Sequence, residues 1–167
     1  MAESLVPSAP TKFNGSGVMQ RMVDGILVRY TIVTEDISEV AINYQATPES
    51  MSMMDLQKHI LMLLNWVSKV MDMEKDPNQK RAETFEEYQD QIKNTCQVLS
   101  AHVASLTDEE ISTKTVYLKR SDTHYSIWYI INGPLSDAIS HIGQIATWRR
   151  IAGNPIPRIS PFTGEKY

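Results

Sequence analysis

The chain has 167 residues, the usual size of one domain, and 42% of them are hydrophobic, which is enough for a sizeable core. A formal charge of −4, with no basic run longer than two residues, excludes a general nucleic-acid binder, because phosphate binding needs clustered Lys and Arg. One cysteine excludes an internal disulfide, and no stretch approaches the roughly 18 apolar residues of a membrane span, so we expect a cytoplasmic protein without a membrane partner.

The first half of the chain predicts an arm and two helices. Residues 1–17 are rich in Ser, Pro and Gly and lack the apolar core of a signal peptide, so we expect a flexible arm. A first helix is expected over about residues 18–33, followed by a long connection, residues 34–50, of a length that often covers a functional site. Residues 52–55, Ser-Met-Met-Asp, indicate a capping box for a second helix, which Pro77 cannot continue. Its apolar residues recur at helical spacing: Leu56, Ile60, Leu63, Leu64, Val67 and Met71.

The second half predicts two further helices with an extended segment between them. Residues 84–87 form another capping box, and the apolar stripe that follows comprises Phe85, Tyr88, Ile92, Cys96, Leu99 and Val103. Residues with high β propensity on both sides of residues 121–123 predict a short hairpin or an extended arm. The last helix is expected over about residues 126–152, with a kink or a fresh start at Pro134 and a stop at Gly153.

Four long helical segments in one small domain predict an all-α fold, a four-helix bundle over residues 18–152. The short extended or hairpin segment would precede the last helix. Residues 153–167 are proline-rich and are expected to form an extended tail.

Three side chains of this predicted bundle suit a metal ion. Asp137 and His141 are spaced i and i+4, so both lie on one face of the last helix and can converge on one ion. His59 lies within the apolar stripe of the second helix, and bundles build metal sites from inward side chains on facing helices. From spacing alone, a surface Asp–His pair and a histidine satisfied within the core remain alternatives.

A resemblance adds to this pattern. The stretch SDAISHIGQIATWRRIAGNPIP, residues 136–157, resembles the last helix of the DinB-like family, whose members carry a histidine, a Gly-Gln pair, an arginine and a terminal glycine, here His141, Gly143, Gln144, Arg149 (or Arg150) and Gly153. Trp128 also fits the family's pattern, as does the spacing between His59 and Trp66. The resemblance covers most of the chain and is strongest in the last helix.

The resemblance implies a four-helix bundle of up-down-down-up arrangement that often holds a divalent metal on three histidines. Carried over by position, the ligands are His59, Asp137 and His141, and Asp137 replaces the family's usual middle histidine. A carboxylate is a competent but harder ligand, which leaves zinc, nickel, manganese and iron all open. Family members are often homodimers, so a homodimer is expected here as well.

Five further residues are candidates for supporting the metal ligands or lining a pocket: Gln144, Trp66, Trp128, Trp148 and Arg149. Capping, solvent contact or core packing would explain them equally. Cys96 falls in an apolar stripe and is interpreted as a structural thiol, and His102 and His124 as peripheral, because no partner stands at ligand spacing from them.

These features predict a metal-dependent enzyme that acts on a small molecule. The resemblance implies a hydrolase or a transferase that uses a thiol, with a low-molecular-weight thiol as cosubstrate in some relatives. No dedicated general acid or base accompanies the three ligands in the sequence, so no catalytic residue beyond them is assigned. The alternatives are a non-enzymatic bundle that binds a small molecule or a metal, and an inactive scaffold, either of them related to stress.

Overall fold

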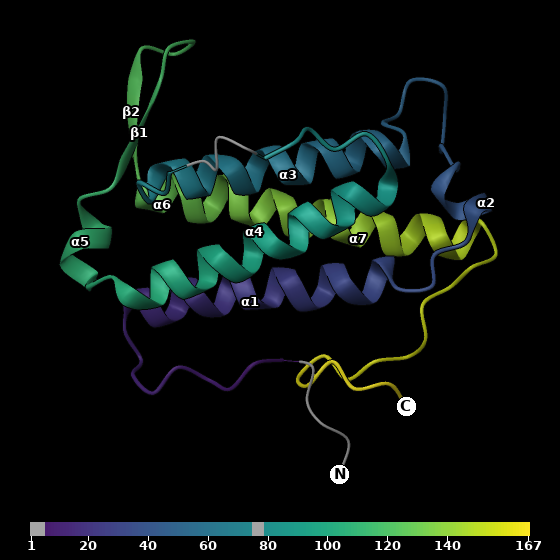
Figure 1. Ribbon diagram of the computed structural model, residues 1–167, viewed down its shortest axis with the longest axis horizontal. Coiled ribbons are helices and arrows are strands. Elements are labelled where there is room, and N and C mark those ends of the chain that lie inside the picture. The colour runs from purple at the N-terminus through teal and green to yellow at the C-terminus, as the bar shows by residue number, and fades with distance from the viewer. Residues whose placement is uncertain (1–5, 75–78) are drawn as a thin grey trace.

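The computed structural model describes residues 6–74 and 79–167, and this part of the chain is mostly helical. Its long helices are α1 (Gly15–Thr34), α3 (Met53–Val70), α4 (Phe85–Ser105) and α7 (Ser136–Ile151). They lie side by side, with α1 and α7 running in one direction and α3 and α4 in the other (Figure 1). Because α1 and α3 each contact both α4 and α7, the helices surround a common core. None of the described helices is both long and apolar enough to cross a lipid bilayer.

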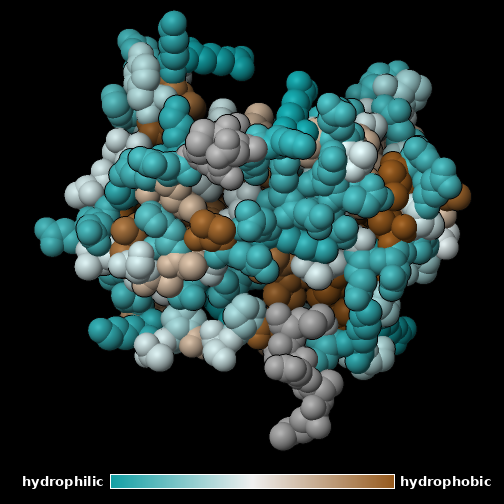
Figure 2. Space-filling view, viewed as in Figure 1, coloured by the Kyte–Doolittle hydropathy of each residue, from teal (hydrophilic) through white to brown (hydrophobic). Residues whose placement is uncertain are grey.

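The core is formed by the apolar stripes that the sequence predicts. Every residue predicted for the stripe of α3 is buried, as is every residue predicted for that of α4. Burying one such Leu or Ile side chain contributes roughly 1.5–3 kcal/mol, so these two stripes account for much of the packing energy. On the face shown in Figure 2 the surface is mainly hydrophilic and is interrupted by apolar patches.

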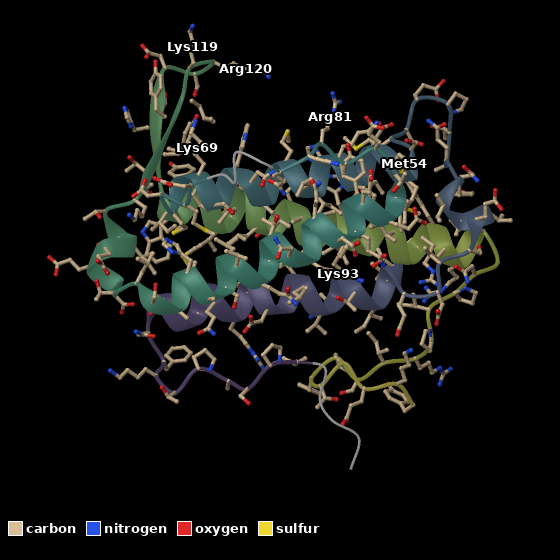
Figure 3. All side chains as sticks on the ribbon, in the orientation of Figure 1. Met54, Lys69, Arg81, Lys93, Lys119 and Arg120 are labelled. Carbon is tan, nitrogen blue, oxygen red and sulfur yellow. The ribbon has the colours of Figure 1, made fainter. Side chains whose placement is uncertain are left out.

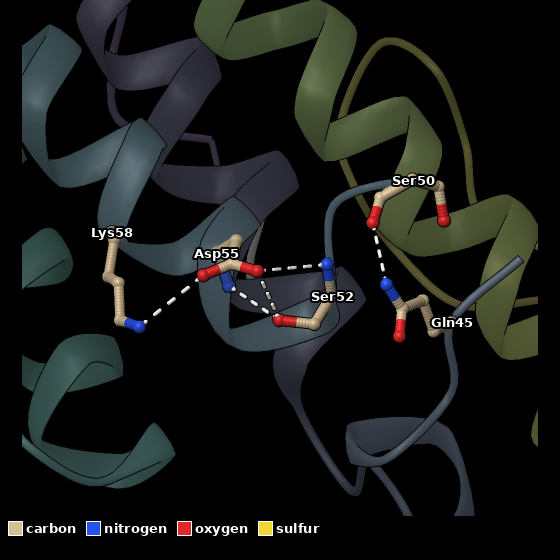
Figure 4. A network of polar contacts seen from close by, with 5 residues as sticks. All are labelled: Gln45, Ser50, Ser52, Asp55 and Lys58. Carbon is tan, nitrogen blue, oxygen red and sulfur yellow. Dashed lines mark hydrogen bonds and ion pairs between the residues drawn. The ribbon is translucent and has the colours of Figure 1, made fainter. Parts of the chain in front are cut away.

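Both predicted capping boxes are present. In α3 the N–H of Asp55 donates to Oγ of Ser52 at 3.1 Å, and the N–H of Ser52 donates to Oδ2 of Asp55 at 3.2 Å (Figure 4). In α4 the reciprocal bonds between Thr84 and Glu87 are 3.2 and 3.1 Å. Each box satisfies backbone donors that the first turn of a helix leaves free, and so fixes where these helices begin.

Helix α3 ends earlier than the proline predicted to stop it. Its last residue is Val70, whereas Pro77 lies outside the described residues. The N–H groups of Asp72 and Met73 donate back to carbonyls of the last helical turn at 3.1 and 3.0 Å. Asp72 has a left-handed backbone, with φ 58°, as this type of helix end requires.

The first helix begins at Gly15, three residues before the predicted start. Asn14 causes the difference, because its side chain accepts the N–H of Gly17 at 3.1 Å and acts as the N-cap. The carboxylate of Asp108 also accepts the N–H of Ser16, at 2.9 Å. The last three residues of the predicted arm therefore belong to α1.

The predicted hairpin is present, and two short helices occur where none was predicted. Strands β1 (Thr115–Leu118) and β2 (Thr123–Ser126) pair antiparallel, and the hairpin stands out from one end of the helices (Figure 1). Helix α2 (Glu39–Ile42) interrupts the long connection, and α5 (Asp108–Ser112) follows the end of α4. Each begins at a hydroxyl N-cap, Ser38 for α2 and Thr107 for α5.

The last helix continues through Pro134, where a kink or a fresh start was predicted, by forming a π-helical turn. Helix α6 (Ile127–Ile130) passes into a single π-helical turn, η1 (Ile131–Leu135), and then into α7. The proline has no N–H to donate to an earlier turn, and a π-turn accommodates that loss by inserting a residue. The inserted residue shifts the rotational setting of α7 relative to α6, and Asp137 is the second residue of α7.

Gly153 ends α7 as predicted. Its φ is 77°, and the N–H of the next residue, Asn154, donates to the carbonyl of Arg149 at 2.8 Å. We expect Gly153→Ala to lower the free energy of unfolding by about 1 kcal/mol, because a side chain strains this left-handed backbone although a Cβ atom there would meet no other atom within 4 Å.

The control for this substitution is Gly25→Ala, within α1. A Cβ atom at Gly25 would also have open space, but the backbone there is helical, so the substitution should raise the free energy of unfolding by about 0.5–1 kcal/mol. Urea denaturation followed by circular dichroism measures both changes. Two changes of the same sign would contradict this account of Gly153.

Candidate metal centre

The histidine predicted on the second helix lies on the side of α3 that faces α7. Nε2 of His59 is 3.2 Å from Oδ2 of Asp137, a contact between residues 78 positions apart in the sequence. The side chain of His59 is 26% exposed, while the stripe around it is buried. His59 therefore stands at the edge of the core, with its ring directed across the boundary between the two helices.

Asp137 lies between two imidazole rings. Its Oδ2 contacts His59, and its Oδ1 lies 3.5 Å from Nε2 of His141, one helical turn further along α7. The two rings meet edge to face, with centroids 4.7 Å apart. One nitrogen from each histidine and one carboxylate oxygen all lie within 4.8 Å of one another.

Gln144 determines which nitrogen of His141 faces this cluster. Its Oε1 lies 2.5 Å from Nδ1 of His141 and, being a carbonyl oxygen, accepts the Nδ1–H. In the neutral ring Nε2 then carries a lone pair that faces Oδ1 of Asp137. Two acceptors face each other favourably only when a proton or a cation lies between them.

The spacing of the ligand atoms suits a small divalent cation. Metal–nitrogen and metal–oxygen bonds of about 2.0–2.2 Å place neighbouring ligands of one ion roughly 3.0–3.6 Å apart. The contacts of His59 with Oδ2 and of His141 with Oδ1 of Asp137, at 3.2 and 3.5 Å, fall in that range, and one ligand atom from each of the three residues lies within 4.8 Å of the other two. The negative carboxylate and the oriented imidazole nitrogens also match what a divalent ion requires, so the three residues fit a metal.

The cluster is open on one side. The side chains of Asp137 and His141 are 46% and 15% exposed, so the carboxylate reaches the surface while the histidines line its inner side. Three protein ligands leave coordination positions for water or a substrate, as catalytic metal sites do and closed structural sites do not.

The three predicted tryptophans lie elsewhere in the molecule. Trp66 lines a hollow formed by α3, the segment that leads into α4, and α4 itself. Trp128, in α6, is 73% exposed. Trp148 is buried, and its ring packs against that of Tyr44 with centroids 6.0 Å apart. Among the residues predicted to support the ligands, Gln144 is the one whose described contacts include a hydrogen bond to a ligand.

Arg149 has a structural position at the end of α1. The residue is only 3% exposed, and its guanidinium donates to the backbone carbonyls of Val33, Glu35 and Asp36, at distances from 2.7 to 3.1 Å. Burial lowers the pKa of Arg149, and the nearby Asp36 and Glu35 partly oppose that effect. The sequence made Arg149 a candidate for supporting the metal ligands, but its guanidinium binds backbone oxygens at the end of α1.

The remaining cysteine and histidines of the chain have structural positions away from the candidate ligands. Burial, with a contribution from the charge of Asp24, raises the pKa of the Cys96 thiol to about 12, so this cysteine is a poor nucleophile. Nε2 of His102 lies 2.9 Å from the carbonyl of Met71 at the end of α3. His124 packs against Tyr117 in the hairpin. These placements agree with the structural and peripheral roles expected from the sequence.

Comparison of the chain with protein-family models, with curated proteins and with solved structures gave no match. The chemistry of the site is therefore argued from the geometry of its side chains.

Proposed function

We propose that this protein is a metal-dependent enzyme that acts on a small molecule at a divalent metal site formed by His59, Asp137 and His141. The observation that carries the proposal is the convergence of two imidazoles and one carboxylate from two helices, with Nε2 of His141 3.5 Å from Oδ1 of Asp137 and Nε2 of His59 3.2 Å from Oδ2. Zinc, nickel, manganese and iron all accept such a mixed nitrogen and oxygen set.

Four side chains have distinct roles in the proposed site. His59 and His141 present Nε2 atoms from facing helices, and Asp137 contributes the negative charge that offsets part of a divalent cation. Gln144 holds the ring of His141 in one tautomer, as residues behind metal ligands commonly do. A divalent ion bound there would supply Lewis acidity that polarises a substrate oxygen or lowers the pKa of bound water or thiol.

The reaction class we propose is hydrolysis or transfer to a thiol. Among the described residues, the cluster of potential ligands consists of these three side chains, which leaves no further carboxylate, imidazole or thiol there to act as a separate general base. Such a site suits reactions in which the nucleophile is activated by direct contact with a cation. The half-exposed carboxylate marks the side from which a small substrate, or a low-molecular-weight thiol, would enter.

We further propose that the fold is a four-helix bundle of the up-down-down-up type and that the chain is a member of the DinB-like family acting in the cytoplasm. The directions of α1, α3, α4 and α7 in Figure 1 support the bundle. The spacing of His141, Gln144 and Gly153 supports the family, and a single buried cysteine suits a reducing compartment.

Metal analysis followed by activity assays tests this function. Protein purified without a histidine tag or chelator should contain near-stoichiometric zinc, nickel, manganese or iron by plasma mass spectrometry. The loaded protein should then hydrolyse activated esters or amides, or add a small thiol to an electrophile, and a chelator should abolish the activity. Protein that neither contains nor takes up these ions would exclude the metal site, and loaded protein inactive in both screens would favour a binding role.

A further inference from the structure

A second candidate site lies where α3 borders α4 and the segment that precedes α4. A hollow of about 530 Å³ is formed by α3, by the segment that leads into α4, and by α4 itself. Its floor includes the buried side chains of Ala82 and Tyr88. This volume is within the range of about 300–1,000 Å³ that is usual for small-molecule sites.

Among the described residues, the charged side chains that line this hollow are basic. They are Lys58, Lys80 and Arg81, with no carboxylate from 6–74 or 79–167 in the lining, although the whole chain carries a net charge of −4. Lys58 is paired at its far side with Asp55, at 3.3 Å (Figure 4). Lys80 and Arg81 form no ion pair with any residue in 6–74 or 79–167, and Arg81 projects from the upper edge of the molecule in Figure 3. A concave surface with one sign of charge concentrates ions of the opposite sign, here anions.

The carboxylate that acts electrostatically on Lys80 is already engaged. Glu87 accepts the backbone N–H groups of Glu83 and Thr84 at 2.7 and 3.1 Å, and these bonds, more than Lys80, lower its pKa. Glu87 stays negatively charged near Lys80, but its Oε2 accepts the two backbone N–H groups and forms no ion pair with Lys80 among the described contacts, so the ammonium group of Lys80 can still contact a bound anion.

An aromatic side chain accompanies this positive charge. Trp66 lines the hollow and is 43% exposed, and Met62 beside it is 39% exposed. Such exposure is unusual for large apolar side chains within a concave surface and leaves an indole available for stacking. The amide side chains of Asn65 and Gln91 supply polar groups on the two helices that border the hollow.

The basic wall is held in place by the protein itself. The side-chain amide of Gln91 donates to the carbonyl of Lys80 at 2.7 Å, and Ala82 is only 4% exposed. The capping box of α4 fixes the chain immediately after this segment. A wall that is ordered before binding reduces the entropy lost when a ligand binds.

We propose that this hollow binds an aromatic anion, with the ring of the ligand against Trp66 and its acidic group between Lys80 and Arg81. The apolar floor and the indole favour a planar ring, and the basic wall favours a negative charge. None of the three candidate metal ligands lines the hollow, so the two sites are made of different residues.

Titration with 8-anilinonaphthalene-1-sulfonate, a fluorescent aromatic anion, tests this proposal on the full chain. The wild-type protein should bind the probe, and the double substitution Lys80→Gln with Arg81→Gln should raise its Kd by at least about 10-fold, since two charge-assisted contacts are lost. The matched control is Lys119→Gln with Arg120→Gln, at the tip of the hairpin (Figure 3), which removes the same charge far from the hollow and should change Kd less than about 2-fold.

The aromatic contact is tested separately. Trp66→Leu should weaken binding and Trp66→Phe should largely restore it, because Phe retains a stacking surface. The indole N–H signal of Trp66, identified by its loss in Trp66→Leu, should shift when the probe is added, and a neutral probe, N-phenyl-1-naphthylamine, should be insensitive to the charge substitutions. The proposal would be overturned if the Lys80/Arg81 and Lys119/Arg120 double substitutions weakened probe binding equally. It would also be overturned if the probe bound without a shift of the Trp66 signal.

Discussion

His141→Ala is expected to remove nearly all bound divalent metal, from close to one equivalent to a small fraction, and His59→Ala should do the same. Each histidine supplies one of only three protein ligands, so losing either leaves a two-ligand site that competes poorly with water. We expect the metal affinity to fall by well over about 100-fold, which exceeds the 10–100-fold usual for residues that merely support a ligand. Plasma mass spectrometry after gel filtration gives the metal content.

Substitution at Gln144 should lower the metal affinity less than substitution of either histidine. Gln144→Ala removes the acceptor that orients His141 and is expected to lower metal affinity by about 10-fold, whereas Gln144→Glu keeps an acceptor and should retain most of it. His102→Ala is the matched control, because His102 contacts only the end of α3 among the described polar partners.

Metal retained at one equivalent in His141→Ala, with an unchanged helical circular dichroism spectrum, would refute the assignment of these ligands.

The long helices were predictable because their signals are local. Capping boxes such as that of Ser52 and Asp55, and the buried stripes of α3 and α4, are each encoded within a few turns. The π-turn before α7 was anticipated only as an irregularity at Pro134, because its form depends on how the chain packs against α3. Helices α2 and α5 were missed, since a segment of four or five residues is too short to show a periodic apolar pattern.

The clustering of His59, Asp137 and His141 was predictable and its surroundings were not. Spacing of i and i+4 brings Asp137 and His141 together whatever the fold, and His59 lies at the edge of the stripe of α3. The residues of α4 and of the preceding segment that Trp66 meets depend on the contact between α3 and α4, which no local pattern specifies. The hollow beside Trp66 was missed for the same reason, because Lys58 and Arg81 are distant in sequence and are brought together by the approach to α4.

Arg149→Ala is expected to lower the free energy of unfolding by about 3 kcal/mol. The buried guanidinium donates to the carbonyl of Val33 in the last turn of α1 and to those of Glu35 and Asp36 just beyond it. The loss of a buried charged donor costs roughly 1.5–3 kcal/mol per strong bond before relaxation. Its Nε also donates to the carbonyl of Asn154 at 3.0 Å, and the side chain of Asn154 accepts the N–H of Ser38 at 2.9 Å. Arg149 thus ties the end of α1 to the end of α7.

Two further variants separate the hydrogen bonds of Arg149 from its charge. Arg149→Lys keeps the charge near the negative end of the α1 dipole but cannot reach several carbonyls at once, so it should recover only part of the loss. Arg150→Ala, at the exposed neighbouring position, should change stability by less than about 0.5 kcal/mol. Urea denaturation followed by circular dichroism at 222 nm gives the free energy of unfolding of each of the three variants. Their metal content at low temperature should remain unchanged. Equal stability of the Arg149→Ala and Arg150→Ala proteins would mean that the carbonyls at the end of α1 find water as readily as they find the guanidinium.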